Sequence, residues 1–252
     1  MKKEIIFHED FYQVYANDPA ASPGRMEAII AELNDFNIIS PEPAQDEDIL
    51  LVHTKTHLSR VKSDWEQVYS IAALSAGGAV LASDYALNKN PIFAVIRPPG
   101  HHASPEGYWG FCYLNNIAIA IQKLLNENRI NNAVIVDFDF HFGDGTNNTF
   151  SSNANVNYYS GQGRTNEQFI QNLKNYLSNK KNIDILGVSA GFDRGIEDWG
   201  KLLTIDDYHQ IGKTLKAFST EVCSGRRFAV LEGGYNHKVL GKNVRAFIEG
   251  FY

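Results

Sequence analysis

The stretch VDFDFHFGDG, residues 136–145, continues an apolar run and then turns polar. Asp137, Asp139 and His141 stand at alternate positions in it. Because side chains of a strand alternate between its two faces, these three share one face and the intervening phenylalanines share the other. The apolar residues that come before them predict a strand buried on both faces, as in a parallel sheet covered by helices. The stretch therefore predicts a buried strand that carries chemistry at its carboxyl end.

Apolar runs of strand length alternate with segments of helical spacing along the rest of the chain. The expected strands are 3–7, 48–53, 92–97, 131–139, 155–160, 183–190 and 227–232, and the expected helices are 24–33, 68–87, 115–125, 166–177 and 204–218. This alternation predicts an α/β fold, with a mainly parallel β-sheet flanked by helices and the active site at the carboxyl ends of the strands. We find no repeat or linker-like boundary, so residues 1–252 are expected to form a single domain.

The composition narrows the partners that we expect. A formal net charge of −6 argues against binding to nucleic acid and weakly favours cationic ligands. The two cysteines, Cys112 and Cys223, are too few for a disulfide framework. The apolar run near the start is too short for a signal peptide, and no stretch approaches the ~20 apolar residues of a membrane span. We therefore expect a cytoplasmic protein without a membrane partner, whose oligomeric state the sequence leaves open.

Four of the expected strands end abruptly in polar or glycine-rich sequence, and in a parallel sheet these ends share one rim. They carry His101 and His102, then Asp139 and His141, then Asp193, then Tyr235. Asp139 and His141 share a strand face, and Asp193 could supply a third ligand from another strand end. Two carboxylates and one imidazole with an open position suit a catalytic Zn²⁺ or Fe²⁺. Taken alone, the D-x-H triplet is equally well explained by groups that cap loops.

Adjacent histidines after Pro-Pro-Gly could supply a general base and a general acid. This requires neighbours that set their pKa values apart, and Asp137 and Asp144 are available as carboxylate partners. A carboxylate on the far ring nitrogen fixes the tautomer and raises the basicity of an imidazole. Tyr235 follows two glycines and is a candidate oxyanion donor, although a packed aromatic beside a turn explains this segment better when it is taken alone.

Five motifs in order resemble one known family. They are RPPGHHA (97–103), GFCYLNN (110–116), VDFDFHFGDGT (136–146), SAGFD (189–193) and LEGGY (231–235), with a weaker match in SPGRMEAI (22–29). Together they resemble the zinc-dependent histone deacetylase superfamily, which includes the acetylpolyamine amidohydrolases. The sequences of RPPGHHA and LEGGY are closer to the class II and bacterial amidohydrolase branch than to class I.

The resemblance implies a role for each matching residue. Zn²⁺ would be held by Asp139, His141 and Asp193; His101 would pair with Asp137 and His102 with Asp144 for general acid and base work; Tyr235 would polarise the amide carbonyl. Gly110, Phe111 and Gly233 would line the acyl channel, and Arg25 would lie near the cavity for acetate release. A structural K⁺ would be bound by oxygens of Asp137, Asp139 and His141 together with Ser160.

The chain also departs from the family pattern. Phe142 stands where the family usually has a second histidine. The segments 59–68 and 160–169 are brief, and the latter lacks the aromatic residue that usually faces Phe111 across the channel. The two brief segments predict a shallower, more open entrance, unless another subunit completes it.

The expected activity is removal of acetyl or short acyl groups from amines such as N6-acetyl-lysine or acetylpolyamines, in a small-molecule or peptide substrate. One alternative is a serine hydrolase, because GVSAG (187–191) matches the G-x-S-x-G nucleophile elbow at Ser189. Its histidine would then be His209 or His237. A second alternative is a non-catalytic binder of acyl-lysine. His53 and His57 lie four residues apart and are expected to be surface or packing residues.

Overall fold

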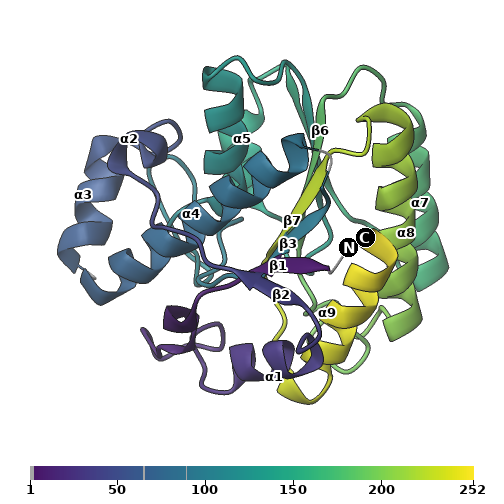
Figure 1. Ribbon diagram of the computed structural model, residues 1–252, viewed down its shortest axis with the longest axis horizontal. Coiled ribbons are helices and arrows are strands. Elements are labelled where there is room, and N and C mark those ends of the chain that lie inside the picture. Colours follow the sequence, from purple (N-terminus) through teal and green to yellow (C-terminus); the bar gives the residue numbers. More distant parts are fainter. Residues whose placement is uncertain (1–2, 65, 89) are drawn as a thin grey trace.

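A computed structural model describes residues 3–64, 66–88 and 90–252, and in this part of the chain seven strands form one parallel sheet (Figure 1). The strands are β1 (Glu4–Ile6), β2 (Asn37–Ile39), β3 (Ile92–Ala94), β4 (Ala133–Asp137), β5 (Val156–Ser160), β6 (Ile185–Ala190) and β7 (Arg227–Leu231). Their order is β2-β1-β3-β7-β6-β4-β5, and each neighbouring pair is parallel. The prediction of an α/β fold with a parallel sheet is confirmed.

Helices cover both faces of this sheet. They are α1 (Arg25–Glu32), α2 (Asp46–Ile49), α3 (Lys55–Asp64), α4 (Glu66–Leu87), α5 (Asn116–Asn126), α6 (Asp144–Phe150), α7 (Asn166–Ser178), α8 (Ile205–Val222) and α9 (His237–Phe251), with a 3₁₀ turn η1 (Glu9–Tyr12). Figure 1 shows α4 and α5 on one side of the sheet and α7, α8 and α9 on the other. This double cover explains why the central strands are apolar on both faces.

Alternate side chains at the end of β4 point to opposite sides, so one of them anchors the candidate site to the hydrophobic core. Phe138 is buried, and its ring packs against Phe192 and Phe247 at centroid distances of 5.7 and 5.1 Å. Asp137 and Asp139 flank Phe138 in the chain and are directed to the rim of the sheet instead. The aromatic contacts of Phe138 therefore help to hold the neighbouring carboxylates of Asp137 and Asp139 in place.

The expected strand at 48–53 is wrong. Its first residues end helix α2, whose first turn carries three acidic side chains, and a turn follows. Acidic groups stabilise the positive end of a helix, and in this segment that effect outweighs the strand-like run ILLV. The three-residue edge strand β2 and the helices α3, α6 and α9 were not predicted from the sequence.

One helix in the described part of the chain is long and apolar enough to cross a membrane. This segment, Gln67–Leu87 of α4, has a mean hydropathy of 1.3, contrary to the expectation that no stretch comes near that length. Within its most apolar window, 67% of the residues are buried inside the protein. Helix α4 packs against β7, β3 and α5, as a core helix does.

Candidate metal centre and active site

The loops after β4 and β6 bring Asp139, His141 and Asp193 together. One ligand atom of each lies within 4.8 Å of the others. Each carboxylate is held by the backbone: Asp139 Oδ2 accepts from the N–H of Gly233 at 2.8 Å, and Asp193 Oδ1 accepts from the N–H of Phe140 at 3.0 Å. The two aspartates are buried and the histidine is more open. The three candidate ligands thus converge as the sequence predicts.

The donor set fits a divalent ion. Asp193 Oδ2 is buried and has no hydrogen-bond donor among the described residues, although His141 Nδ1 lies 3.0 Å away outside hydrogen-bonding geometry. The carboxylates of Asp139 and then Asp193 raise the pKa of His141 to about 9. Burial, followed by the charge of Asp139, raises the pKa of Asp193. An oxygen buried without a donor beside an imidazole and a second carboxylate suits Zn²⁺ or Fe²⁺ with three protein ligands.

His101 is backed by a carboxylate. Its Nδ1 lies 2.9 Å from Asp137 Oδ2, which also accepts from the hydroxyl of Tyr158 at 2.9 Å. Its Nε2 lies 3.7 Å from Asp139 Oδ1. Burial alone would lower the pKa of His101, but the charges of Asp139 and Asp137 together raise it well above its ordinary value. Tyr158 was not predicted as a site residue, because it belongs to none of the motifs in the sequence.

His102 has a separate carboxylate and an aromatic cover. Its Nδ1 lies 2.6 Å from Asp144 Oδ1, and the indole N–H of Trp109 donates to Asp144 Oδ2 at 2.9 Å. The ring of Trp109 lies 3.9 Å from that of His102. Burial, followed by the charge of His101, lowers the pKa of His102. The surroundings therefore move the two imidazole pKa values apart, as an acid and base pair requires.

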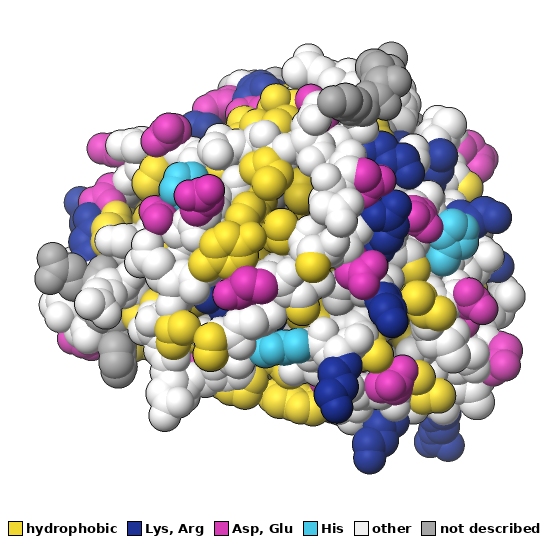
Figure 2. Space-filling model, turned by 60° about the horizontal axis from the view of Figure 1, so that its bottom comes forward, with side chains coloured by type: hydrophobic (Ala, Val, Ile, Leu, Met, Phe, Trp, Pro, Cys, Tyr) yellow, Lys and Arg dark blue, Asp and Glu magenta, His cyan; other side chains and the backbone are white. Residues whose placement is uncertain are grey.

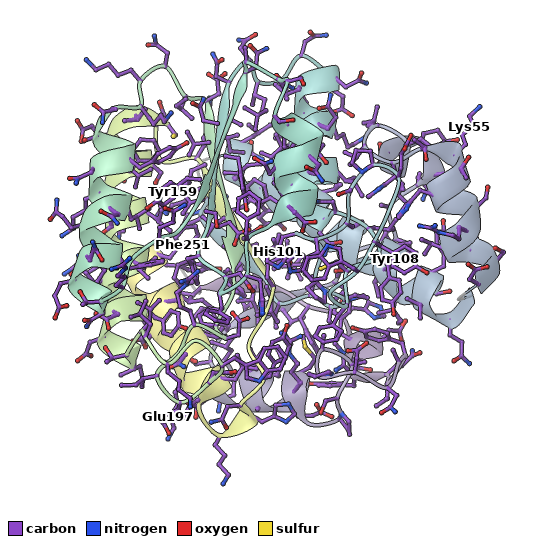
Figure 3. The ribbon with its side chains drawn as sticks, turned by 180° about the vertical axis from the view of Figure 1, so that it is seen from behind. Lys55, His101, Tyr108, Tyr159, Glu197 and Phe251 are labelled. Carbon is purple, nitrogen blue, oxygen red and sulfur yellow. The ribbon has the colours of Figure 1, made fainter. Side chains whose placement is uncertain are left out.

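These groups surround a cavity of about 130 Å³. It is lined by Pro99, His101, His102, Trp109, Gly110, Phe111, His141, Trp199, Gly233 and Tyr235. Figure 3 shows His101 near the centre of the molecule and Glu197, in the loop after β6, at its lower edge. Figure 2 turns that edge forward and shows hydrophobic side chains gathered in a band on this face.

The entrance is more aromatic than the sequence analysis predicts. Residues 160–169 supply no ring opposite Phe111, as expected, but Trp199 takes that part from the loop after β6. Its ring lies 4.1 Å from that of Tyr235, which in turn lies 6.0 Å from Phe111. Trp199 is 46% exposed and Trp109 is 55% exposed, so both stand at the mouth. The open entrance expected from the short loops is therefore narrowed by two tryptophans.

Two channel glycines allow close approach. A Cβ on Gly110 would lie 2.4 Å from Cδ2 of His102, and Gly110 has φ of +57°, where a side chain is strained. A Cβ on Gly233 would lie 2.5 Å from Asp139 Oδ2. Phe142, in place of the family histidine, is half-exposed and packs on Tyr158.

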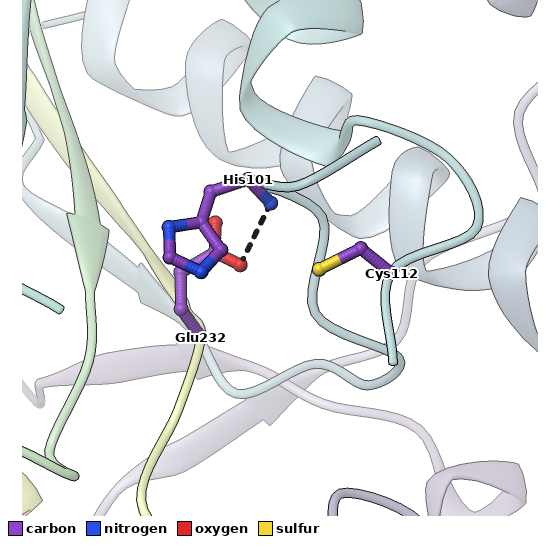
Figure 4. A group of neighbouring side chains, drawn as sticks. All are labelled: His101, Cys112 and Glu232. Atoms are coloured by element: carbon purple, nitrogen blue, oxygen red, sulfur yellow. Dashed lines mark hydrogen bonds between the residues drawn. The ribbon is translucent and has the colours of Figure 1, made fainter. Parts of the chain in front are cut away.

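A buried group beneath the cavity organises the loop that carries the histidines. Glu232 Oε2 accepts from the N–H of His101, as Figure 4 shows, and also from the N–H of Gly100. Its Oε1 accepts from the hydroxyl of Ser189. Burial raises the pKa of Glu232 to about 7 and raises that of the neighbouring Cys112 thiol well above its ordinary value. Glu232 stands within the LEGGY motif, but no function was predicted for it from the sequence.

Arg25 lies below the same segment. Its Nε donates to the carbonyl of Gly234 at 2.8 Å and its Nη2 to the carbonyl of Glu232 at 2.6 Å. Its guanidinium lies 5.6 Å from the ring centroid of Tyr235. Arg25 thus holds the glycine pair that sets the position of Tyr235.

The surroundings of Asp139 do not fit the expected monovalent cation. That site was expected from oxygens of Asp137, Asp139 and His141 with Ser160. The carbonyl oxygen of Asp139 instead accepts from Nη2 of Arg194 at 2.5 Å. The carbonyl of Asp137 accepts from the N–H of Gly161 at 2.7 Å.

The structure does not support the alternative of a nucleophile elbow at Ser189. Ser189 lies inside β6, is fully buried and donates to Glu232 at 3.0 Å. An elbow needs a helix directly after the strand, but in the described chain the next helix, α8, begins only at Ile205. His209 instead lies on α8, with its Nδ1 3.2 Å from the carbonyl of Ala246.

His53 and His57 are packing residues and are not on the surface. Their rings stack at 4.5 Å, and both are buried. His53 Nε2 accepts from the N–H of Asn115 at 2.9 Å, and His57 Nε2 lies 2.8 Å from the carbonyl of Tyr113. They support the far end of the loop that carries His102.

The chain is similar to proteins of one family. The histone deacetylase domain matches residues 20–169 and 162–251. A probable deacetylase of Methanothermobacter thermautotrophicus is 29% identical over 98% of this chain and 90% of that protein, and one of Archaeoglobus fulgidus is 29% identical over 92% and 81%. The crystal structure of the HDA15 HD domain is 23% identical and has a TM-score of 0.86, over 99% of this chain and 89% of that chain.

Proposed function

This chain belongs to the histone deacetylase domain family, which makes it a deacetylase of the metal-dependent amidohydrolase class, and we propose that it releases acetyl or another short acyl group from a primary or secondary amine. The observation that supports this is the convergence of Asp139, His141 and Asp193 with two carboxylate-backed imidazoles around one small cavity. The substrate would be a small molecule or a peptide bearing an acylated amine, such as acetyl-lysine or an acetylpolyamine.

We assign Asp139, His141 and Asp193 to a Zn²⁺ ion, for which Fe²⁺ could substitute. A divalent ion held there would lower the pKa of a water molecule and polarise the amide carbonyl. The reaction adds water across the amide bond, so one proton leaves the water and one reaches the amine. The remaining work falls to residues of the cavity wall.

The two imidazoles carry these protons. His101 and His102 each have Nδ1 held against a carboxylate, so Nε2 is the atom of each ring that exchanges protons in the cavity. One ring takes the proton from water and the other gives a proton to the leaving amine. Asp137 and Asp144 fix the tautomers during this exchange.

Tyr235 supplies a hydrogen bond to the oxygen on which negative charge develops. Burial, followed by the charges of Asp139 and Asp193, raises the pKa of Tyr235 well above its ordinary value. The phenol therefore stays protonated and can donate a hydrogen bond. Such a donor contributes about 10²–10³ in rate. Arg25 and Trp199 hold the ring from two sides.

The shape of the mouth favours a slender, linear substrate. A cavity of about 130 Å³ accommodates a short acyl group, and Trp109 and Trp199 would flank the chain that leads away from the nitrogen. Aromatic faces and a net charge of −6 are compatible with a cationic amine. We also place the protein in the cytoplasm, which fractionation of the source cells would test.

A direct test is to assay the purified protein on acetyl-lysine peptides and acetylated polyamines. Chelation should abolish turnover and added Zn²⁺ should restore it. Tyr235→Phe should lower kcat by about 10²–10³, whereas Tyr176→Phe, on α7 outside the cavity lining, should not. Turnover that survives complete removal of metal would contradict the proposal, and so would a Tyr235→Phe variant with unchanged kcat.

A further inference from the structure

A buried arginine lies directly behind the candidate metal centre. Arg194 is the residue after Asp193, and only 8% of it is exposed. It donates to four backbone carbonyl oxygens: Nε to Phe138 at 3.2 Å, and Nη2 to Asp139 at 2.5 Å, Phe140 at 3.1 Å and Gly161 at 3.3 Å. A single nitrogen atom, Nη2, is thus surrounded by three carbonyl oxygens from the ends of two strands.

The charge of Arg194 is compensated by these dipoles. Within residues 3–64, 66–88 and 90–252, no carboxylate lies within ion-pair distance of its guanidinium. The rings of Phe140 and Phe169 lie 5.7 and 5.0 Å from its Cζ and shield it from water. Proteins bind a dehydrated monovalent ion in the same way, with backbone carbonyl oxygens that replace its water molecules.

These carbonyls overlap with the expected cation site. That site was expected from oxygens of Asp137, Asp139 and His141 with Ser160, and Gly161 follows Ser160 directly. A free K⁺ would need the carbonyl of Asp139, which Arg194 already occupies. Two positive charges a few ångströms apart in a buried site would repel each other by several kcal/mol, even at an effective dielectric constant near 20.

We propose that the guanidinium of Arg194 replaces a structural monovalent cation and makes the metal centre independent of K⁺ and Na⁺. Arg194 acts as a positioning residue. It ties the segment that carries Asp139 to the end of β5 and to its own loop, which carries Asp193. The part of this inference that concerns zinc affinity rests on the proposed function, whereas the part that concerns stability does not.

The first test uses the wild-type protein in KCl, NaCl and tetramethylammonium chloride at one ionic strength. The melting temperature is measured with and without Zn²⁺, and the zinc affinity is measured against a chromophoric chelator. We expect melting temperatures within about 1 °C and zinc affinities within about twofold across the three salts. A saturable rise of the wild-type melting temperature with K⁺ would overturn the proposal.

The second test removes the built-in cation. Arg194→Ala should lose about 10–100-fold in zinc affinity in tetramethylammonium chloride. Millimolar K⁺ or guanidinium should then restore most of the affinity and of the melting temperature. A folded Arg194→Ala protein with the same loss in every salt would mean that the side chain only packs, and would also overturn the proposal.

Arg227 offers a matched control. It is buried, its guanidinium donates to the carbonyls of Phe251 and Gly225, and it lies over the ring of Phe251. Arg227→Ala should therefore be destabilised equally in all three salts. Recovery of this variant by K⁺ as well would show that the response is not specific to Arg194, against the proposal.

Arg194→Lys keeps the test decisive if the alanine variant does not fold. Its ammonium retains the charge without the planar fork, so the variant should fold, bind Zn²⁺ less tightly than wild type and remain insensitive to K⁺. A lysine variant that gains stability from K⁺ would contradict the proposal. If the wild type binds no Zn²⁺ at all, the proposed function fails, while the melting comparison still decides the inference about Arg194.

Discussion

Gly233→Ala tests the metal centre through a single added methyl group. The new Cβ would lie 2.5 Å from Asp139 Oδ2 and 2.8 Å from Cγ of Asp193. Ordinary contact begins near 3.4 Å, so the carboxylate of Asp139 must move by about 0.9 Å and that of Asp193 by about 0.6 Å. Metal–oxygen distances are held to about 0.2 Å, so both movements exceed what the site tolerates.

The expected loss is therefore one of metal binding. Perturbed support of a ligand typically costs about 10–100-fold in affinity, equivalent to about 1.4–2.7 kcal/mol. Zinc affinity is measured by competition with a chromophoric chelator. As a second readout, the stabilisation that saturating Zn²⁺ gives the variant should fall by the same amount.

Gly187→Ala is the matched control, since Gly187 is buried in β6 and the atoms nearest to its added Cβ would be the side-chain ends of Ile117 and Phe228, at 3.2 and 3.3 Å. This variant should bind Zn²⁺ like the wild type. The reasoning is refuted if Gly233→Ala retains wild-type zinc affinity, or if Gly187→Ala loses as much.

Three further substitutions separate the roles of the surrounding groups. Asp144→Asn leaves His102 without its carboxylate, so kcat should fall about 10–100-fold with little change in KM in steady-state assays; an unchanged kcat would remove His102 from the mechanism. Trp199→Ala takes away the ring that packs against Tyr235, so KM for an acylated amine should rise about 3–10-fold while zinc affinity stays constant. A loss of zinc affinity in this variant would show that Trp199 supports the metal centre instead. Ser189→Ala should keep kcat within about twofold and lower the free energy of unfolding by about 1–3 kcal/mol in denaturant melts, because a buried acceptor loses its donor. Abolished turnover in that variant would revive the serine hydrolase alternative.

Much of the candidate site follows from local rules. The D-x-H spacing places Asp139 and His141 on one strand face, and the apolar runs before each motif predict parallel strands whose ends meet at one rim. The sequence-based predictions failed where the local preference of a segment was outweighed by its surroundings. The run at 48–53 has the composition of a strand, but the acidic residues before it begin a helix. The alternative based on GVSAG fails for a related reason, because Ser189 lies inside β6 and no helix follows directly after that strand.

Contacts across the sheet lay beyond the sequence analysis. Tyr158 supports Asp137 from β5, and Glu232 supports the histidine loop from the position directly after β7. Trp199 forms the wall that the loop after β5 lacks. No local sequence pattern marks these residues as part of the site, because the partner that each one contacts lies tens of residues away in the chain.

By itself, then, the sequence determined the parallel α/β architecture and the residues that meet at the strand ends, since both depend on the period of a strand and the direction of its neighbours. Only the tertiary structure decided which residues surround them, such as Trp199 at the entrance and Arg194 next to the candidate metal centre. Arg194 follows a ligand in the chain, but its carbonyl partners at 138–140 and 161 come within reach only when β4, β5 and β6 pair side by side. Strand period is a local property of the chain, whereas the compensation of a buried charge depends on every segment packed around it.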